Sequence, residues 1–271
     1  MRKKNRIKKV IVKNGRKIPY FIYGEGEPTI LLVGVSIHCM PQIHYFSQKY
    51  KVAIMALEEL WDSEDLPTEY TANILTENLK AIVEDLNDSK IFLLGIGFGG
   101  TLAIRYVAKH AKRISKLALL ATPPKPLIYD SKKKKRFEEF WALALQSPSW
   151  GLRNFYDRVL APSYPGRWVG VRPRLGIRST SKVPPEIALI SWKVLVEADV
   201  RSFLEKIRLP TLILHGDKDL MPMEDVEYLK KGIAGSKLHI FKDAALVSVT
   251  KPDEFNKIIE EFLITGQVPK K

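Results

Sequence analysis

The sequence contains very little cysteine and no long hydrophobic run. Cys39 is the only cysteine among the 271 residues, which excludes an intramolecular disulfide and fits a reducing compartment. No stretch approaches the roughly 20 consecutive apolar residues that a membrane-spanning helix needs. Charged residues interrupt residues 10–18, so the apolar core of a signal peptide is missing as well. We therefore expect a cytoplasmic protein without a membrane span.

Acidic residues are also scarce relative to basic ones. The sequence has 30 Asp and Glu residues against 44 Lys and Arg residues, which produces a formal net charge of +14. Much of this excess lies at residues 2–9 and 132–136. Such a surplus strengthens the attraction to polyanions but says nothing about the fold. Glutamine is scarce while Lys, Glu, Ile and Leu are plentiful, a composition that favours a heat-adapted source.

Short apolar runs alternate with amphipathic segments along most of the chain. Hydrophobic residues make up 45% of the sequence, enough for a sizeable core. The predicted strands are residues 7–12, 17–23, 29–33, 51–56, 90–94, 114–120, 209–215 and 237–241, the first two joined by an Asn14-Gly15 turn. The predicted helices are residues 68–86, 101–109, 225–231 and 252–263. This alternation predicts an α/β fold with a mostly parallel central sheet flanked by helices.

The alternation stops in the middle of the chain. Residues 123–206 contain prolines, tryptophans and a basic run, with helical stretches near 137–145 and 185–197. We interpret this segment as a helical lid or cap inserted over one end of the sheet. Residues 1–122 and 207–271 then form a single core domain.

A glycine-rich turn follows the predicted strand 90–94. The segment Gly95-Ile96-Gly97-Phe98-Gly99-Gly100 joins this strand to the next helix. It resembles the nucleophile elbow G-x-S-x-G, in which the flanking glycines permit a tight turn and the central residue attacks the substrate. Here Gly95 and Gly99 occupy the flanking positions, and Gly97 stands where the nucleophile would be.

The order and spacing of several segments resemble the α/β-hydrolase superfamily over nearly the whole chain. In that superfamily the first central strand ends in His-Gly, and Val33 stands at the histidine position. Residues 210–222 are similar to the loop that carries the triad acid, which aligns with Asp219. Residues 241–246 are similar to the segment that ends in the triad histidine, where this chain has Leu246. The resemblance implies an α/β-hydrolase fold with degenerate triad positions.

The two missing side chains have a chemical consequence. A triad needs a nucleophile, a base that takes its proton, and an acid that orients the base. Gly97 and Leu246 supply neither of the first two, so Asp219 would have no imidazole to orient. We expect a non-catalytic binding or scaffold protein rather than an enzyme. The alternative is an active hydrolase of the esterase or amidase kind with rearranged catalytic residues.

The loop expected after Gly34 contains the candidates for such a rearrangement. Ser36, His38 and Cys39 should lie at the carboxyl edge of the sheet, where open α/β folds bind ligands. Adjacent side chains rarely face each other, however, and a lone cysteine is more often a small buried hydrophobe. His215, at the end of a strand, is interpreted as structural.

An oxyanion site is formed by backbone amides, so it can remain when the triad side chains are missing. The resemblance implies an oxyanion site formed by the N–H groups of Val35 and Phe98, with the N-terminus of the following helix adding positive potential. A small anionic or ester-like ligand under the lid would fit this site. The histidines show no metal-ligand spacing, so we expect neither a metal site nor a cofactor.

The same glycines also match a dinucleotide fingerprint. Gly95, Gly97 and Gly100 follow a strand and open a helix, as G-x-G-x-x-G requires. The acidic residue expected about 20 residues later is absent from 119–123. The fingerprint is therefore the weaker interpretation.

The insertion offers a further partner surface. Arginine and aromatic residues together are typical of interface hot spots and of nucleic-acid platforms. Residues of both kinds gather in it: Arg136, Phe137, Phe140, Trp141, Trp150, Arg153, Phe155, Tyr156, Arg158, Tyr164, Arg167, Trp168, Arg172, Arg174 and Arg178. The plain interpretation is a lid whose aromatic residues pack on the sheet, and the alternative is a docking surface for a protein or polyanion such as nucleic acid.

Overall fold

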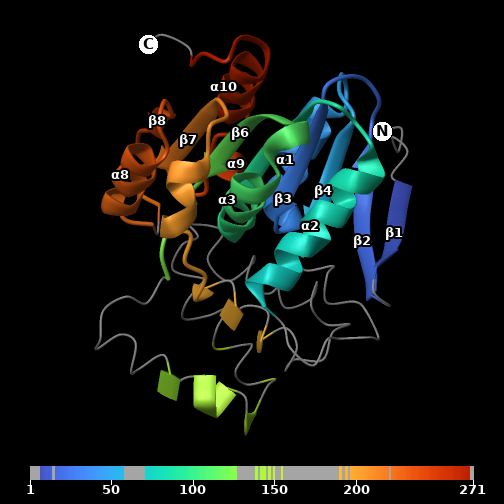
Figure 1. Ribbon diagram of the computed structural model, residues 1–271. Helices are drawn as coiled ribbons and strands as arrows, with labels where there is room; N and C mark the ends of the chain where they lie inside the picture. The colour runs from blue at the N-terminus through green and yellow to red at the C-terminus, as the bar shows by residue number, and fades with distance from the viewer. Residues whose placement is uncertain are drawn as a thin grey trace.

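The computed structural model describes residues 7–13, 16–57, 71–126, 198–219 and 221–268, with short pieces between 138 and 197. Within these residues eight strands form one sheet in the order β1-β2-β4-β3-β5-β6-β7-β8 (Figure 1). The strands are β1 (Ile7–Lys13), β2 (Arg16–Tyr23), β3 (Thr29–Gly34), β4 (Val52–Ala56), β5 (Ile91–Ile96), β6 (Ile114–Leu120), β7 (Thr211–Gly216) and β8 (Lys237–Phe241). β1 and β2 form an antiparallel hairpin, and β2 joins β4 antiparallel. The remaining neighbours are parallel, which confirms the predicted fold class.

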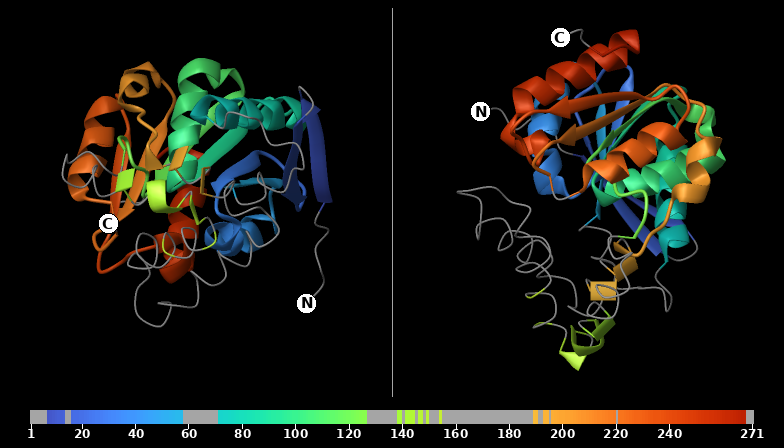
Figure 2. Two further views of the ribbon diagram at one scale, coloured as in Figure 1. Left: turned by 90° about the horizontal axis from the view of Figure 1, so that it is seen from below. Right: turned by 90° about the vertical axis from the view of Figure 1, so that its left-hand side faces the viewer.

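Helices cover both faces of the sheet (Figures 1 and 2). They are α1 (Ser36–Phe46), α2 (Ala72–Leu86), α3 (Phe98–His110), η2 (Ala111–Arg113), η6 (Arg201–Lys206), α8 (Met223–Gly232), α9 (Val247–Thr250) and α10 (Pro252–Thr265). α2, α3, η6 and α8 share one buried cluster with the sheet, and α1, α9 and α10 share the other. This two-sided cover explains why β3, β4, β5 and β7 are buried along their whole length.

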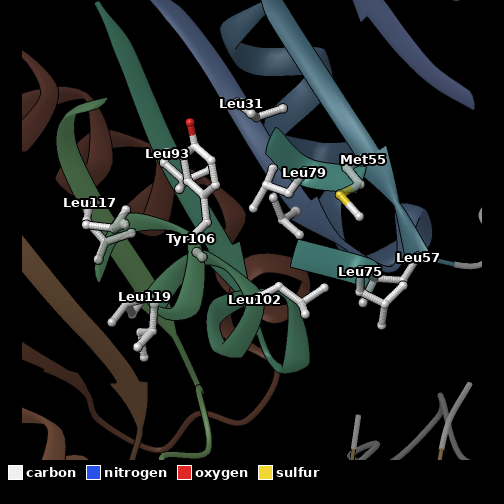
Figure 3. Packing of buried hydrophobic residues seen from close by; sticks show 14 of the residues in the cluster. Leu31, Met55, Leu57, Leu75, Leu79, Leu93, Leu102, Tyr106, Leu117 and Leu119 are labelled. Carbon is white, nitrogen blue, oxygen red and sulfur yellow. The ribbon is translucent and has the colours of Figure 1, made fainter. Parts of the chain in front are cut away.

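The core beneath α2 and α3 consists of branched side chains from both layers. Leu31, Leu93 and Leu117 come from three neighbouring parallel strands, and Leu79 and Leu102 come from the two helices above them (Figure 3). Each is fully buried. Burying one such side chain contributes about 1.5–3 kcal/mol relative to leaving it exposed. The apolar face that the sequence predicts for α2 is thus the face that packs on the sheet.

The predicted hairpin is confirmed by its strand pairing. Lys13 lies opposite Arg16, so two residues connect β1 to β2. Asn14 and Gly15 themselves lie outside the described residues. The register leaves Ile18 and Tyr20 buried on one face of β2.

One sequence prediction is wrong at a place that matters for the site. The segment after Gly34 forms the helix α1, where the sequence predicts a loop. Its buried positions Cys39, Gln42, Ile43 and Phe46 follow helical spacing. A polar residue within this stripe and a proline inside the helix, Pro41, conceal that pattern in the sequence.

The insertion falls mostly outside the described residues, including most of its arginine and aromatic side chains. The division into a core and a lid therefore stays a prediction. At its start, Lys125 forms an ion pair of 2.9 Å with the buried Asp225 of α8. At its end, η6 packs against α3 and buries Leu204 in the core. Among the described residues, no helix is long and apolar enough to cross a membrane.

Candidate functional site at the carboxyl edge of the sheet

The turn between β5 and α3 has an unusual backbone conformation. Gly97 has φ 58° and ψ −124°, a region that residues with a side chain rarely adopt. Among the described residues, a Cβ atom built on Gly97 would meet nothing within 4 Å beyond the adjoining backbone. Space for a side chain therefore exists at this position, and the sequence leaves it empty.

Close packing holds this turn against the end of β3. A Cβ atom on Gly99 would lie 1.9 Å from the carbonyl oxygen of Val33, and one on Gly95 would lie 2.4 Å from the Cα of Gly100. Both contacts are with backbone, so no rotamer change relieves them. The two flanking glycines are thus required by close approach, and they bring the start of α3 beside the Val33–Gly34 backbone.

The helices α1 and α3 begin beside the Gly97 turn. Val35 immediately precedes α1, and Gly97 immediately precedes α3. The residues that precede them, Val35 and Gly97, make no side-chain hydrogen bond to the first amides. Helix N-termini carry partial positive charge and amide donors. The structure therefore places the predicted residues Val35 and Phe98 at the starts of these two neighbouring helices.

The acid loop after β7 contacts the segment before α9. The Oδ2 atom of Asp219 accepts a hydrogen bond from the amide of Leu246 at 3.0 Å. Asp217 Oδ1 accepts one from the Ala244 amide at 3.2 Å. The backbone amides of Asp243 and Ala244 hold the pKa of Asp217 below its ordinary value. The structure thus brings Asp219 and Leu246 together, as the sequence alignment expects.

The backbone of Leu246 adopts a left-handed conformation. Its φ of 49° and ψ of 50° place it in the left-handed region, directly before α9. For a residue with a branched side chain this costs about 1–2 kcal/mol. The hydrogen bond from its amide to Asp219 helps to hold that conformation.

A buried polar network that the sequence did not reveal links α1 to α9 and α10. The amide nitrogen of Gln42 donates to the carbonyl oxygen of Ser248 at 2.8 Å and to Asn256 Oδ1 at 3.2 Å. All three residues are buried. More than 200 positions separate Gln42 from the other two residues, so no local sequence pattern predicts these contacts. α1 begins at Ser36, and α9 begins directly after Leu246. The network therefore holds the segment around Ser36 in a fixed position relative to the segment around Leu246.

His215 is the second-to-last residue of β7, just before the loop that contains Asp217 and Asp219. Its side chain is 1% exposed, and burial lowers its pKa in spite of the nearby carboxylates of Asp219 and Asp217. Its Nδ1 atom has no hydrogen-bond partner among the described residues. A neutral, enclosed imidazole agrees with the structural role expected for it.

The alternative nucleophiles lie on α1. Cys39 is completely buried, and its Sγ atom lies 3.3 Å from the Cβ position of Gly34. It packs as a small hydrophobic side chain. Ser36 and His38 are half-buried in the first turns of the helix. The described residues contain no group of three or more His, Cys, Asp or Glu side chains that would hold a metal ion.

Comparison with known proteins establishes the family. The family model described as the alpha/beta hydrolase fold matches residues 46–245. The chain therefore belongs to the α/β-hydrolase fold family. This membership accounts for the order of strands, the turn at Gly97 and the acid loop together, which the dinucleotide interpretation does not.

Individual relatives are distant and are named as hydrolases. Poly(3-hydroxyalkanoate) depolymerase of Ectopseudomonas oleovorans is 28% identical over 186 residues, which cover 67% of this chain but only 64% of that protein. Serine hydrolase BPHL of Homo sapiens is 25% identical over 272 residues, covering 92% of this chain and 84% of its own.

Solved structures share the fold. The bromoperoxidase from Bacillus anthracis superposes with a TM-score of 0.79 at 20% identity, covering 95% of this chain and 99% of its own. The enol-lactonase from Burkholderia xenovorans superposes with a TM-score of 0.76 at 21% identity, covering 94% and 99%. These likenesses concern the architecture alone.

Proposed function

We propose that this α/β-hydrolase family member binds a ligand with a carboxylate or ester carbonyl group beside Val35, Gly97 and Phe98, and does not form a covalent intermediate with it. The observation that carries the proposal is the backbone of Gly97. Its backbone conformation is one that residues with a side chain rarely adopt, the described residues leave open space at its Cβ position, and it has no side chain to attack with. The predicted lid, residues 123–206, lies mostly outside the described residues.

The expected rate acceleration without a nucleophile or a base supports ligand binding rather than catalytic turnover. Loss of a nucleophile or a base leaves a rate acceleration of roughly 10³–10⁴ over water, supplied by the oxyanion donors and by binding. Working enzymes accelerate their reactions by about 10⁶-fold or more. The positive ends of α1 and α3 would still attract a ligand oxygen, because backbone amides do not depend on the triad side chains.

A second function, hydrolysis by rearranged residues, is favoured by the relatives. The similar proteins are named as a depolymerase and a serine hydrolase. In this chain, the half-buried Ser36 supplies a hydroxyl group at the same edge. The buried thiol of Cys39 is a poorer candidate because it is enclosed by the core.

A covalent probe and an ester substrate separate the two functions. We expect a fluorophosphonate probe to leave the protein unlabelled, and p-nitrophenyl acetate turnover to be equal in the wild type and in Ser36→Ala. Labelling of the wild type that is lost in Ser36→Ala, together with a loss of turnover, would establish hydrolysis and contradict the binding proposal. Thermal unfolding of both proteins controls for folding. Binding itself is measured by titration with butyrate, whose affinity should fall in Gly99→Ala because that methyl group displaces the edge.

A further inference from the structure

Three basic side chains converge on one aromatic ring away from the candidate site. The guanidinium carbon of Arg105 lies 4.9 Å from the centroid of the Phe203 ring. The ammonium nitrogens of Lys109 and Lys206 each lie 5.7 Å from the same centroid. Arg105 and Lys109 are one turn apart on α3, and Phe203 and Lys206 belong to η6. The packing of η6 on α3 therefore assembles the cluster.

No carboxylate neutralises these charges in the described part of the chain. Arg105 donates to the amide oxygen of Asn73 at 2.6 Å, and Lys109 and Lys206 form no ion pair there. The next basic residue of η6, Arg201, does have a carboxylate partner, Asp199, at 2.6 Å. The cluster differs from its surroundings in concentrating positive charge without an anion.

Arg105 is the least exposed member of the cluster. Burial lowers the pKa of its guanidinium, and its buried Nε atom has no hydrogen-bond partner among the described residues. Like charges held close together repel each other, and a partly desolvated charge is costly. Cation–π contact with Phe203 offsets some of that cost.

The helix dipole explains only one of the three positions. Lys109 lies in the last turn of α3, where a cation is favourable. The same argument does not place Lys206 of η6 against the same ring.

We propose that Arg105, Lys109 and Lys206 form a binding site for clustered phosphate groups. Arginine presents a planar fork that suits phosphate oxygens, and the two exposed lysines supply mobile point charges around it. A multivalent anion fits best, because a single charge would leave most of the repulsion in place. The site is distinct from the edge at Gly97, since about 18 Å of α3 separate Gly97 from Lys109 at about 1.5 Å per residue.

Isothermal titration of the full chain with tripolyphosphate at about 0.15 M salt tests the site. We expect saturable binding that weakens about tenfold or more in Lys109→Gln/Lys206→Gln, because two charge-assisted contacts are lost. The matched control is Lys17→Gln/Lys257→Gln, which has the same net charge and changes two exposed lysines elsewhere. Absence of saturable binding, or equal weakening in both double variants, overturns the proposal.

The full chain is required because residues 58–70, which lie outside the described residues, carry six acidic side chains shortly before Asn73. Any neutralisation of the cluster by these residues is then already present in the measurement. Failure of tripolyphosphate to bind the intact protein counts against the site, whatever the cause.

Thermal unfolding distinguishes a binding site from simple packing on Phe203. In phosphate-free buffer the site variant should unfold at the same temperature as the wild type or higher, because two repelling charges have been removed. Tripolyphosphate should raise the unfolding temperature of the wild type and of the control, but not that of the site variant. A lower unfolding temperature for the site variant with unchanged anion binding assigns the lysines to packing alone and overturns the proposal.

Discussion

At the scale of single residues, the proposed function depends on Gly97. Its backbone has φ 58° and ψ −124° at the turn from strand to helix, and in the proposed function it supplies no attacking atom. A glycine adopts this conformation without steric cost, whereas any other residue would be strained there. Lack of space does not explain the missing side chain, because in the described part of the chain a Cβ atom there would meet nothing within 4 Å beyond the adjoining backbone.

Replacement of Gly97 by alanine should destabilise the protein by backbone strain alone. We expect Gly97→Ala to lower the free energy of unfolding by about 1–3 kcal/mol in urea denaturation. Gly235→Ala is the matched control, because Gly235 also has a positive φ, 72°, and open space around its Cβ position. It should lose about 1–2 kcal/mol. A loss at Gly97 above about 5 kcal/mol would point to a steric clash, in conflict with the structure.

At the scale of elements, one carboxylate joins α1 and the residues after it to α10. Glu260 accepts hydrogen bonds from the hydroxyl of Tyr45 at 2.8 Å and from that of Tyr50 at 3.1 Å. Lys49 pairs with it at 3.1 Å. Burial acts to raise the pKa of Glu260, but these three partners together outweigh it, so the pKa lies below its ordinary value of 4.5.

The lowered pKa makes the contribution of Glu260 dependent on pH. The folded state prefers the charged carboxylate more strongly than the unfolded chain does. The stabilisation is therefore complete above about pH 4.5 and is lost as the pH falls through the folded-state pKa. We expect Glu260→Gln to be less stable than the wild type at about pH 7, with the difference shrinking toward about pH 3 in chemical denaturation.

The neighbouring Glu261 provides the control for that experiment. No hydrogen bond or ion pair engages its carboxylate within the described residues, so Glu261→Gln should change stability little at either pH. A stability difference for Glu260→Gln that stays constant between the two pH values would show that its carboxylate acts through shape rather than charge.

At the scale of the whole molecule, the site is assembled from segments far apart in the chain. Gly97 follows β5 and Leu246 follows β8, with two strands between them in the sheet. The loop after β8 returns toward α1, because α9 packs against α1 and Gln42 bonds to Ser248. Asp219 contacts the Leu246 amide from the loop after β7.

This assembly predicts that two substitutions together restore a reactive site. In Gly97→Ser/Leu246→His the hydroxyl and the imidazole should lie within hydrogen-bond reach, with Asp219 beside the imidazole. We expect a fluorophosphonate probe to label the introduced hydroxyl of the double variant, located by peptide mass spectrometry, and to label neither single variant comparably. A crystal structure of a folded double variant with the two side chains far apart would show that residues 97 and 246 are not the paired positions.

The fold was largely predictable because its signals are local. A strand buried on both faces needs a continuous apolar run, and a covering helix needs one apolar stripe. Gly95, Gly97 and Gly99 likewise predict a tight turn between a strand and a helix. The sequence analysis missed helix α1 because Pro41 and the buried Gln42 interrupt its apolar stripe. Its packing against β3, β4, α9 and α10 is visible only in the tertiary structure.

Local sequence signals were enough to predict the eight strands, the helices α2, α3, α8 and α10, and the glycine turn at residues 95–100. The tertiary structure alone decided that Asp219 meets the amide of Leu246, that Gln42 reaches Ser248, and that three cations surround Phe203. Apolar periodicity depends on near neighbours in the chain, so it can be recognised in the sequence. These contacts depend instead on how the sheet orders its strands and on where the loops return, which no short stretch of sequence encodes.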